Sequence, residues 1–182
     1  TKDFYLLDDN EIVEIYKDNL AFYDFNLKQI TKELESISWD ASAIEKNGYD
    51  DFMLKEIHEQ PTAIRESIGF KLKKKKIQLD NITLTKEYLS NVNKIFIVAC
   101  GTAMHAGMAA QSIFENLCNI PVEVEVASEF RYRNPIINEK TLAIFISQSG
   151  ETADTIQALK LAKSKGATTI AFSNVIGSSI TR

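Results

Sequence analysis

The sequence predicts an α/β protein with a doubly wound parallel sheet, and three observations support this prediction. Compact apolar runs rich in β-branched residues recur in the second half of the chain, with helical patterns between them. The runs are almost entirely apolar, as strands are when both faces of a parallel sheet are covered. Alternation of such runs with helices is typical of parallel strands joined by helical crossovers. The predicted strands are residues 94–99, 122–126, 141–146 and 168–172.

Helices are expected in the crossovers between these strands. In the first crossover, apolar residues at helical spacing predict a face packed on the sheet: Ala110, Ile113, Phe114 and Leu117. Residues 153, 156, 159 and 161–162 predict a similar face in the third crossover. Gly166 then occupies the position after a helix where a left-handed residue is favoured.

The first 90 residues are expected to be organised differently. Residues 4–7 and 12–15 predict a β-hairpin, with residues 20–25 as a further strand, which is too few strands for a self-sufficient sheet. Residues 36–51 read as a connecting segment. A helix from residue 52 is expected to break at Gln60, because Pro61 disfavours helix in the preceding residue and suits the first turn of a second helix. The predicted parts are residues 1–35, a short hairpin; 36–90, a linker with helices; and 91–182, the α/β domain.

Composition excludes several classes of function. The chain has 182 residues, 45% of them hydrophobic, and a formal net charge of -4, whereas nucleic-acid binding usually needs a basic face. The one basic run, residues 71–76, is typical of a solvated helix face or loop. No stretch approaches the roughly 20 apolar residues that span a bilayer, and no signal peptide is evident, so we expect a cytoplasmic protein without a membrane partner. The two cysteines and two histidines lack the spacing of a metal site, and no metal is predicted.

Two predicted strands end in loops rich in small and hydroxylated residues. The first loop is residues 100–103 and the second is residues 147–152. In open α/β sheets, ligands bind at the carboxyl ends of the strands, and a helix N-terminus there offers unpaired N–H groups to an anion. The second loop carries three hydroxyls, an amide and a glycine, and its helix is expected to begin near Glu151. We therefore predict an anion site, from which the Glu151 carboxylate should point away because like charges repel.

The residues of these loops also allow other interpretations. Ser149 as a simple helix cap would need only one side-chain oxygen, whereas this loop presents several. Nucleotides are disfavoured because neither GxxxxGK[ST] nor GxGxxG occurs. Cys100 lies at a strand end near a helix start, which can lower a thiol pKa, but no base is close in sequence. We interpret Cys100 as a packing residue.

Several separated motifs, in order, resemble the glutamine:fructose-6-phosphate aminotransferases, also called glucosamine-6-phosphate synthases. They are residues 99–102 (ACGT) with 105–107 (HAG), 128–133 (SEFRYR), 147–155 (SQSGETADT), 174–175 (NV) with 177–179 (GSS), and upstream residues 52–61 (FMLKEIHEQP). The resemblance implies that residues 91–182 are the first, incomplete, sugar-isomerase (SIS) domain, a flavodoxin-like three-layer fold. It implies that residues 1–35 are the end of the glutaminase domain.

The resemblance also implies the chemistry and the residues that serve it. The family converts fructose 6-phosphate and glutamine to glucosamine 6-phosphate and glutamate in amino-sugar biosynthesis, without a cofactor, and acts as a homodimer. By motif position, the phosphate would be held by Ser147, Gln148, Ser149 and Thr152. The sugar would be lined by Cys100, Gly101 and Thr102. Similar sequences often have serine where this chain has Ala103, which removes one hydroxyl.

The resemblance places the remaining catalytic groups outside this chain. These are the cysteine nucleophile of the glutaminase and the acid/base residues and lysine of the isomerase, so we expect the chain alone to be inactive. Two alternatives stay open: a non-catalytic sugar-phosphate sensor built on the same domain, and another phosphosugar isomerase. A regulator would more often carry a basic helix-turn-helix before the domain, and no such pattern occurs.

Overall fold

The computed structural model describes residues 3–36, 45–69, 72–73, 76–77, 82 and 84–182. The chain divides into two compact units, Thr1–Lys75 and Lys76–Arg182. The second unit contains both candidate loops and is therefore described first. No helix among the described residues is both long and apolar enough to cross a lipid bilayer.

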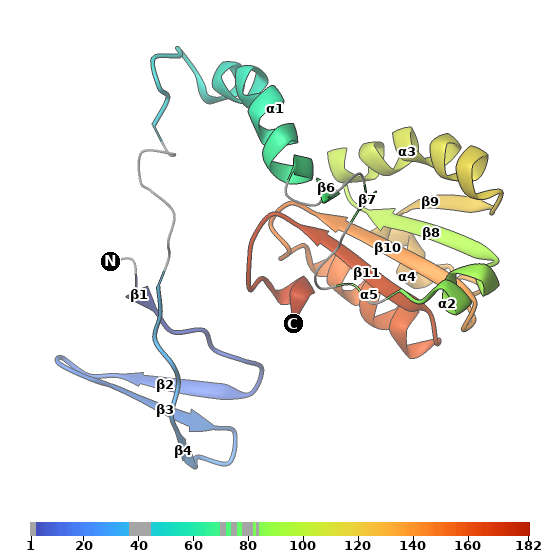
Figure 1. Ribbon diagram of the computed structural model, residues 1–182. Coiled ribbons are helices and arrows are strands. Elements are labelled where there is room, and N and C mark those ends of the chain that lie inside the picture. The colour runs from blue at the N-terminus through green and yellow to red at the C-terminus, as the bar shows by residue number, and fades with distance from the viewer. Residues whose placement is uncertain (1–2, 37–44, 70–71, 74–75, 78–81, 83) are drawn as a thin grey trace. The chain divides into compact units, whose positions relative to one another are not determined.

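The second unit is built on a four-stranded parallel sheet (Figure 1). Its strands are β8 (Lys94–Ala99), β9 (Val122–Val126), β10 (Thr141–Ser147) and β11 (Thr168–Ser173). The spatial order is β11-β10-β8-β9, so the chain moves from β8 to one edge and then returns to the other side of β8. All four predicted strands are confirmed to within one residue, and the predicted doubly wound α/β class is confirmed.

Helices cover both faces of this sheet and make a three-layer structure (Figure 1). Residues of α2 (Lys86–Asn91) and α3 (Thr102–Cys118) pack on one face, against a cluster that includes Ile95, Ile97 and Ile144. Residues of α4 (Ala127–Tyr132) and α5 (Ala153–Ser164) pack on the other face, around Phe96 and Phe145. The central strands β8 and β10 are therefore buried on both sides, which is why they are apolar along most of their length, whereas the edge strand β9 alternates valine with Glu123 and Glu125.

The predicted inner face of α3 is only half right. Ala110 and Phe114 pack on the sheet, but Ile113 is 58% exposed and Leu117 is 80% exposed. The buried line instead runs through Gly107, Ala110 and Phe114, and Ile113 lies about 100° around the helix from Phe114. The outer face of α3 therefore exposes Ile113 and Leu117 and carries no lysine or arginine.

Helix α5 begins later than expected and ends as expected. It starts at Ala153, two residues after the predicted start near Glu151, and its buried residues are Thr155, Ala158 and Ala162. At the other end Gly166 has φ +93°, and the N–H groups of residues 166 and 167 bond back to the carbonyls of residues 163 and 162. This is a Schellman motif, and it confirms the predicted role of Gly166.

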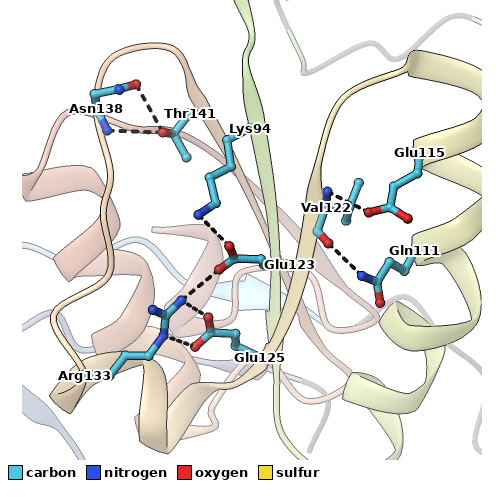
Figure 2. A network of polar contacts seen from close by, with 9 residues as sticks. All are labelled: Lys94, Gln111, Glu115, Val122, Glu123, Glu125, Arg133, Asn138 and Thr141. Atoms are coloured by element: carbon cyan, nitrogen blue, oxygen red, sulfur yellow. Dashed lines mark hydrogen bonds and ion pairs between the residues drawn. The ribbon is translucent and has the colours of Figure 1, made fainter.

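Charged side chains cover the sheet edge formed by β9 (Figure 2). Lys94 Nζ lies 2.7 Å from Glu123, and Arg133 bonds both Glu123, at 2.9 Å, and Glu125. On the other side, Gln111 donates to the Val122 carbonyl at 2.7 Å and so joins α3 to the strand. Partly exposed ion pairs contribute little stability each, but charges along an edge strand oppose unwanted pairing with other chains.

The first unit contains a small antiparallel sheet whose pairing differs from the prediction. Strand β2 (Glu11–Ile15) pairs with β3 (Leu20–Asp24), and β4 (Gln29–Ile30) adds to β3. The predicted hairpin between residues 4–7 and 12–15 is therefore wrong. Tyr16 N donates to the Asn19 carbonyl at 2.9 Å and closes a tight turn after β2. This turn pairs residues 11–15 with residues 20–24, and not with residues 4–7 as expected. The short strands β1 (Asp3–Phe4) and β5 (Glu35–Ser36) pair with each other.

A single helix, α1 (Phe52–Gly69), replaces the predicted helix, break and helix. Pro61 lies inside this helix. Proline removes one backbone hydrogen bond, but the helix continues on both sides of it. Asp51 accepts the Leu54 N–H at 2.7 Å near the start of the helix. In the described part of the basic run lie two short strands, β6 (Leu72–Lys73) and β7 (Lys76–Ile77). Residues 71, 74 and 75 lie outside the described residues, as does half of the predicted connecting segment, residues 37–44.

Candidate functional site

The two candidate loops meet at the point where the chain reverses direction across the sheet. Strands β8 and β10 are direct neighbours, and Ala99 is aligned with Ile146 at their carboxyl ends. The loops that follow, residues 100–103 and residues 147–152, therefore lie side by side. Ligands of open α/β sheets bind at such a switch point, and in this strand order it falls between the first and third strands, which are β8 and β10.

Hydrogen bonds within residues 147–152, called the cradle loop below, define its shape. Ser147 is buried, and its Oγ accepts the Gly150 N–H at 3.0 Å and lies 3.2 Å from Thr152 Oγ1. Ser149 Oγ accepts the Glu151 N–H at 3.2 Å. Ser149 and Thr152 are half-buried, and Gln148 is exposed. The structure thus brings the four predicted phosphate-binding side chains into one turn, with Ser147 at its base.

The start of α5 faces the same turn. Thr152 is the N-cap residue of α5, and its side chain makes no capping hydrogen bond, so the alternative in which Ser149 caps this helix is wrong. The first-turn carboxylate, Asp154, is held by Arg131 at 2.8 Å. A helix start whose N–H groups are not taken by its own cap side chain presents donors and a partial positive charge to an anion.

The predicted sugar-lining residues begin α3. Gly101 is its N-cap, with φ +57° and no side-chain cap, and Thr102 is its first residue and is exposed. Cys100 and Ala103 are half-buried. Thr155 Oγ1 donates to Cys100 Sγ at 3.9 Å, and Cys100 packs on the core beneath α5. The starts of two helices, α3 and α5, therefore lie at the ends of adjacent strands.

Sequence reasoning missed the residues that hold the cradle loop from the next strand along. After β11 the chain forms a short 3-10 turn, η2 (Ser179–Thr181), and Ser178 before it is buried. Ser178 Oγ lies 3.2 Å from Ser173 Oγ, at the end of β11. The small residues at 177–179 are the sequence feature that could have predicted a close approach of this turn to the cradle loop.

The Glu151 carboxylate is also held by this turn, because Ser179 N–H donates to its Oε1 at 2.8 Å. Hydrogen bonding from the Ser179 side chain and then from its backbone N–H lowers the pKa of Glu151 below its ordinary value. Burial opposes this shift, and the nearby Arg182 adds to it. The carboxyl therefore remains ionised at neutral pH, and its stabilising effect is present above the ordinary pKa and lost as pH falls through the lowered one.

The described residues contain no group of three His, Cys, Asp or Glu side chains that could hold a metal ion. What the two loops do offer is a set of neutral hydroxyl and N–H donors at a parallel-sheet switch point. This arrangement defines an α/β domain of the class that binds small anionic ligands at helix N-termini.

The chain belongs to the SIS family, because the family model described as "SIS domain" matches residues 88–182. The matched range includes all four parallel strands and both loops.

Relatives extend the likeness over the whole chain. Glutamine--fructose-6-phosphate aminotransferase [isomerizing] of Caldanaerobacter subterraneus subsp. tengcongensis is 56% identical over 100% of this chain, and that of Clostridium tetani is 55% identical. The chain spans 30% of the length of each of these relatives. Among solved structures, the C-terminal domain of glucosamine-fructose-6-phosphate aminotransferase from Francisella tularensis has a TM-score of 0.68 at 42% identity, covering 76% of this chain and 38% of that one.

Proposed function

We propose that this chain is the sugar-phosphate-binding part of an enzyme that converts fructose 6-phosphate and glutamine to glucosamine 6-phosphate and glutamate. The observation that carries the proposal is the cradle loop, a turn of hydroxyls and N–H donors between the end of β10 and the start of α5. The relatives' names, over the full length of the chain, support the same activity.

The cradle loop would hold the phosphate without any basic side chain. It contains no lysine or arginine, so the dianion must be held by hydroxyls, the Gln148 amide and the N–H groups that begin α5. Hydrogen bonds to a charged group contribute roughly 1.5 to 3 kcal/mol each, and less where water competes. The sugar would then extend toward Cys100, Gly101 and Thr102, where α3 begins, and Ala103 would supply no hydroxyl to it.

The rest of the proposal concerns what lies around this site. We propose that residues 1–35 are the end of a glutamine-hydrolysing domain and residues 36–90 the linker, with residues 91–182 as an incomplete SIS domain. Glutamine would act through that other domain, and the protein would reside in the cytoplasm. The chain alone is proposed to bind without turnover, and glucosamine 6-phosphate formed from ammonia and fructose 6-phosphate above a no-protein control would contradict this.

Titration with fructose 6-phosphate is expected to shift the backbone amide NMR signals of residues 147–152. Binding should be weak, with a Kd around the millimolar range, equivalent to roughly 4 kcal/mol, because a few neutral donors face solvent. Fructose without its phosphate is the control and should leave these signals in place. Unchanged signals in the presence of the phosphorylated sugar would refute the site.

Self-association is expected, and the outer face of α3 is its proposed surface. Ile113 and Leu117 are exposed there, and no charge except Glu115 lies in the last two turns of the helix. Large apolar side chains that lie exposed on one helix face favour burial against a partner, and the resemblance implies that the partner is a second copy. Light scattering should give about twice the 20.5 kDa mass of one chain.

A double variant tests the surface. Ile113→Lys with Leu117→Lys should return the chain to a monomer, whereas Ile136→Lys, at an equally exposed site outside α3, should not. A monodisperse monomer of the unmodified chain at high concentration would count against the proposal.

A further inference from the structure

The turn after β11 holds the cradle loop by three hydrogen bonds, which we call the clasp. The clasp joins the loop to residues 174–180 through three of its residues, Gln148, Gly150 and Glu151. Its bonds are Asn174 N to Gln148 O at 3.2 Å, Ile180 N to Gly150 O at 3.0 Å, and Ser179 N to Glu151 Oε1 at 2.8 Å. Two of these are backbone pairs, and only the third depends on a side chain of the loop.

The side of the clasp that receives the loop is firmly anchored. Ile180 is 6% exposed and belongs to the core on the α4 and α5 side of the sheet, and Ser178 is 3% exposed. Ser178 also packs against Gly150, where even one added carbon would overlap it. A loop tied to buried residues loses little further freedom when it binds a ligand, which favours binding.

The carboxylates near the start of α5 present a physical problem for an anion site. A carboxylate is itself an anion, and a free one would bind the donors at a helix start in place of a ligand. Two carboxylates lie here in sequence, Glu151 and Asp154. Arg131 holds Asp154, and Ser179 N–H holds Glu151. Both negative groups are thus bonded to partners outside the cradle loop.

We infer that Glu151 is a positioning residue of the cradle loop: its bond to the Ser179 N–H fixes the loop and keeps the carboxylate away from the anion site. The inference rests on the proposed function of the loop in binding phosphate. The lowered pKa of Glu151 supports it, because the acceptor stays ionised at neutral pH and its bond to Ser179 is charge-assisted.

Three variants separate positioning from simple charge. Glu151→Ala removes the acceptor and should weaken binding of inorganic phosphate and of fructose 6-phosphate about tenfold, a loss of roughly 1.4 kcal/mol. Glu151→Gln keeps an oxygen acceptor for the Ser179 N–H and should restore affinity to within about threefold of the unmodified chain. The control is Glu139→Ala, which should bind normally. Glu139 is exposed and lies just before β10, whereas the cradle loop follows the other end of that strand.

A change at the donor tests the same bond without touching Glu151. Ser179→Pro removes the N–H, and proline is tolerated because Ser179 is the first residue of η2 and Ser178 before it is extended. This variant should lose affinity as Glu151→Ala does. Amide hydrogen exchange supplies a readout that needs no ligand: the Ile180 N–H should exchange faster in Glu151→Ala and not in Glu139→Ala.

The outcomes distinguish the inference from the proposed function. If the positioning inference is wrong and Glu151 only repels the anion, then both Glu151→Ala and Glu151→Gln will bind phosphate more tightly than the unmodified chain. Unchanged affinity in Glu151→Ala and Ser179→Pro also overturns it. If the unmodified chain binds neither phosphate nor fructose 6-phosphate, the proposed function fails, and unaltered exchange at Ile180 would then reject the clasp independently.

Discussion

Replacing Gly150 with alanine is expected to lower the free energy of unfolding of the second unit by about 2 to 5 kcal/mol. Gly150 has φ +70°, a conformation that costs an alanine about 1 to 2 kcal/mol. A β-carbon there would lie 2.1 Å from Ser178 Oγ and 2.7 Å from Ser173 Oγ, and both of these belong to the packed support of the loop. Such overpacking typically costs about 1 to 3 kcal/mol more.

Gly177 supplies a matched control for the two causes. It has φ +72°, almost the same as Gly150, but nothing lies within 4 Å of the β-carbon that alanine would add. Gly177→Ala should therefore show the backbone cost alone, and the difference between the two variants measures the steric contact. Urea unfolding followed by circular dichroism gives both values.

A second change should repair the first. Ser178→Gly removes the two atoms nearest the new β-carbon, so the double variant with Gly150→Ala should regain part of the lost stability, and the two changes should not be additive. Equal losses in Gly150→Ala and Gly177→Ala would mean that the loop is not tightly packed on Ser178.

The parallel sheet could be predicted because burial on both faces leaves a clear mark on composition. Strands such as β8 and β10 are buried along almost their whole length, and only apolar or small residues fit there. The order of the strands could not be predicted in the same way. It depends on which faces the crossover helices cover, and the residues of one strand do not encode which neighbour lies beside it.

The errors in the first unit and in α3 have local causes. Apolar runs of similar length occur at residues 4–7, 12–15 and 20–25, and only the tight turn after Ile15 decides which two of them pair. Pro61 was expected to break a helix, but the hydrogen bond lost at proline costs less than the helical structure on its two sides gains. In α3, the spacing of apolar residues correctly predicted a helix. Apolar residues occur on more than one face of this helix, so the spacing could not show which face packs on the sheet.

The site was partly predictable for a related reason. Loops at the carboxyl ends of parallel strands carry ligands, so hydroxyl-rich residues after β8 and β10 indicated where to look. The clasp was not predictable, because its donors are backbone N–H groups, which every residue except proline possesses. Glu151 and Ser179 are 28 positions apart, and only the folded chain brings them together.

Removing the hydroxyls of the cradle loop is expected to impair binding and to leave stability nearly unchanged. Ser149→Ala and Thr152→Ala should each weaken fructose 6-phosphate binding about tenfold, because each removes one donor to a charged phosphate, worth about 1.5 kcal/mol or more. Thr152 makes no capping bond to α5, so the usual loss of about 1 kcal/mol on removing a cap is not expected.

Thr85 provides the opposite case within the same unit. It is the N-cap of α2, and its Oγ1 accepts the Tyr88 N–H at 3.1 Å. Thr85→Ala should therefore lower stability by about 1 kcal/mol and leave sugar-phosphate binding intact. NMR titration and urea unfolding of the three variants should give two opposite profiles. If Thr152→Ala instead resembles Thr85→Ala, with reduced stability and unchanged affinity, the hydroxyls of the cradle loop serve the fold and the phosphate is held elsewhere.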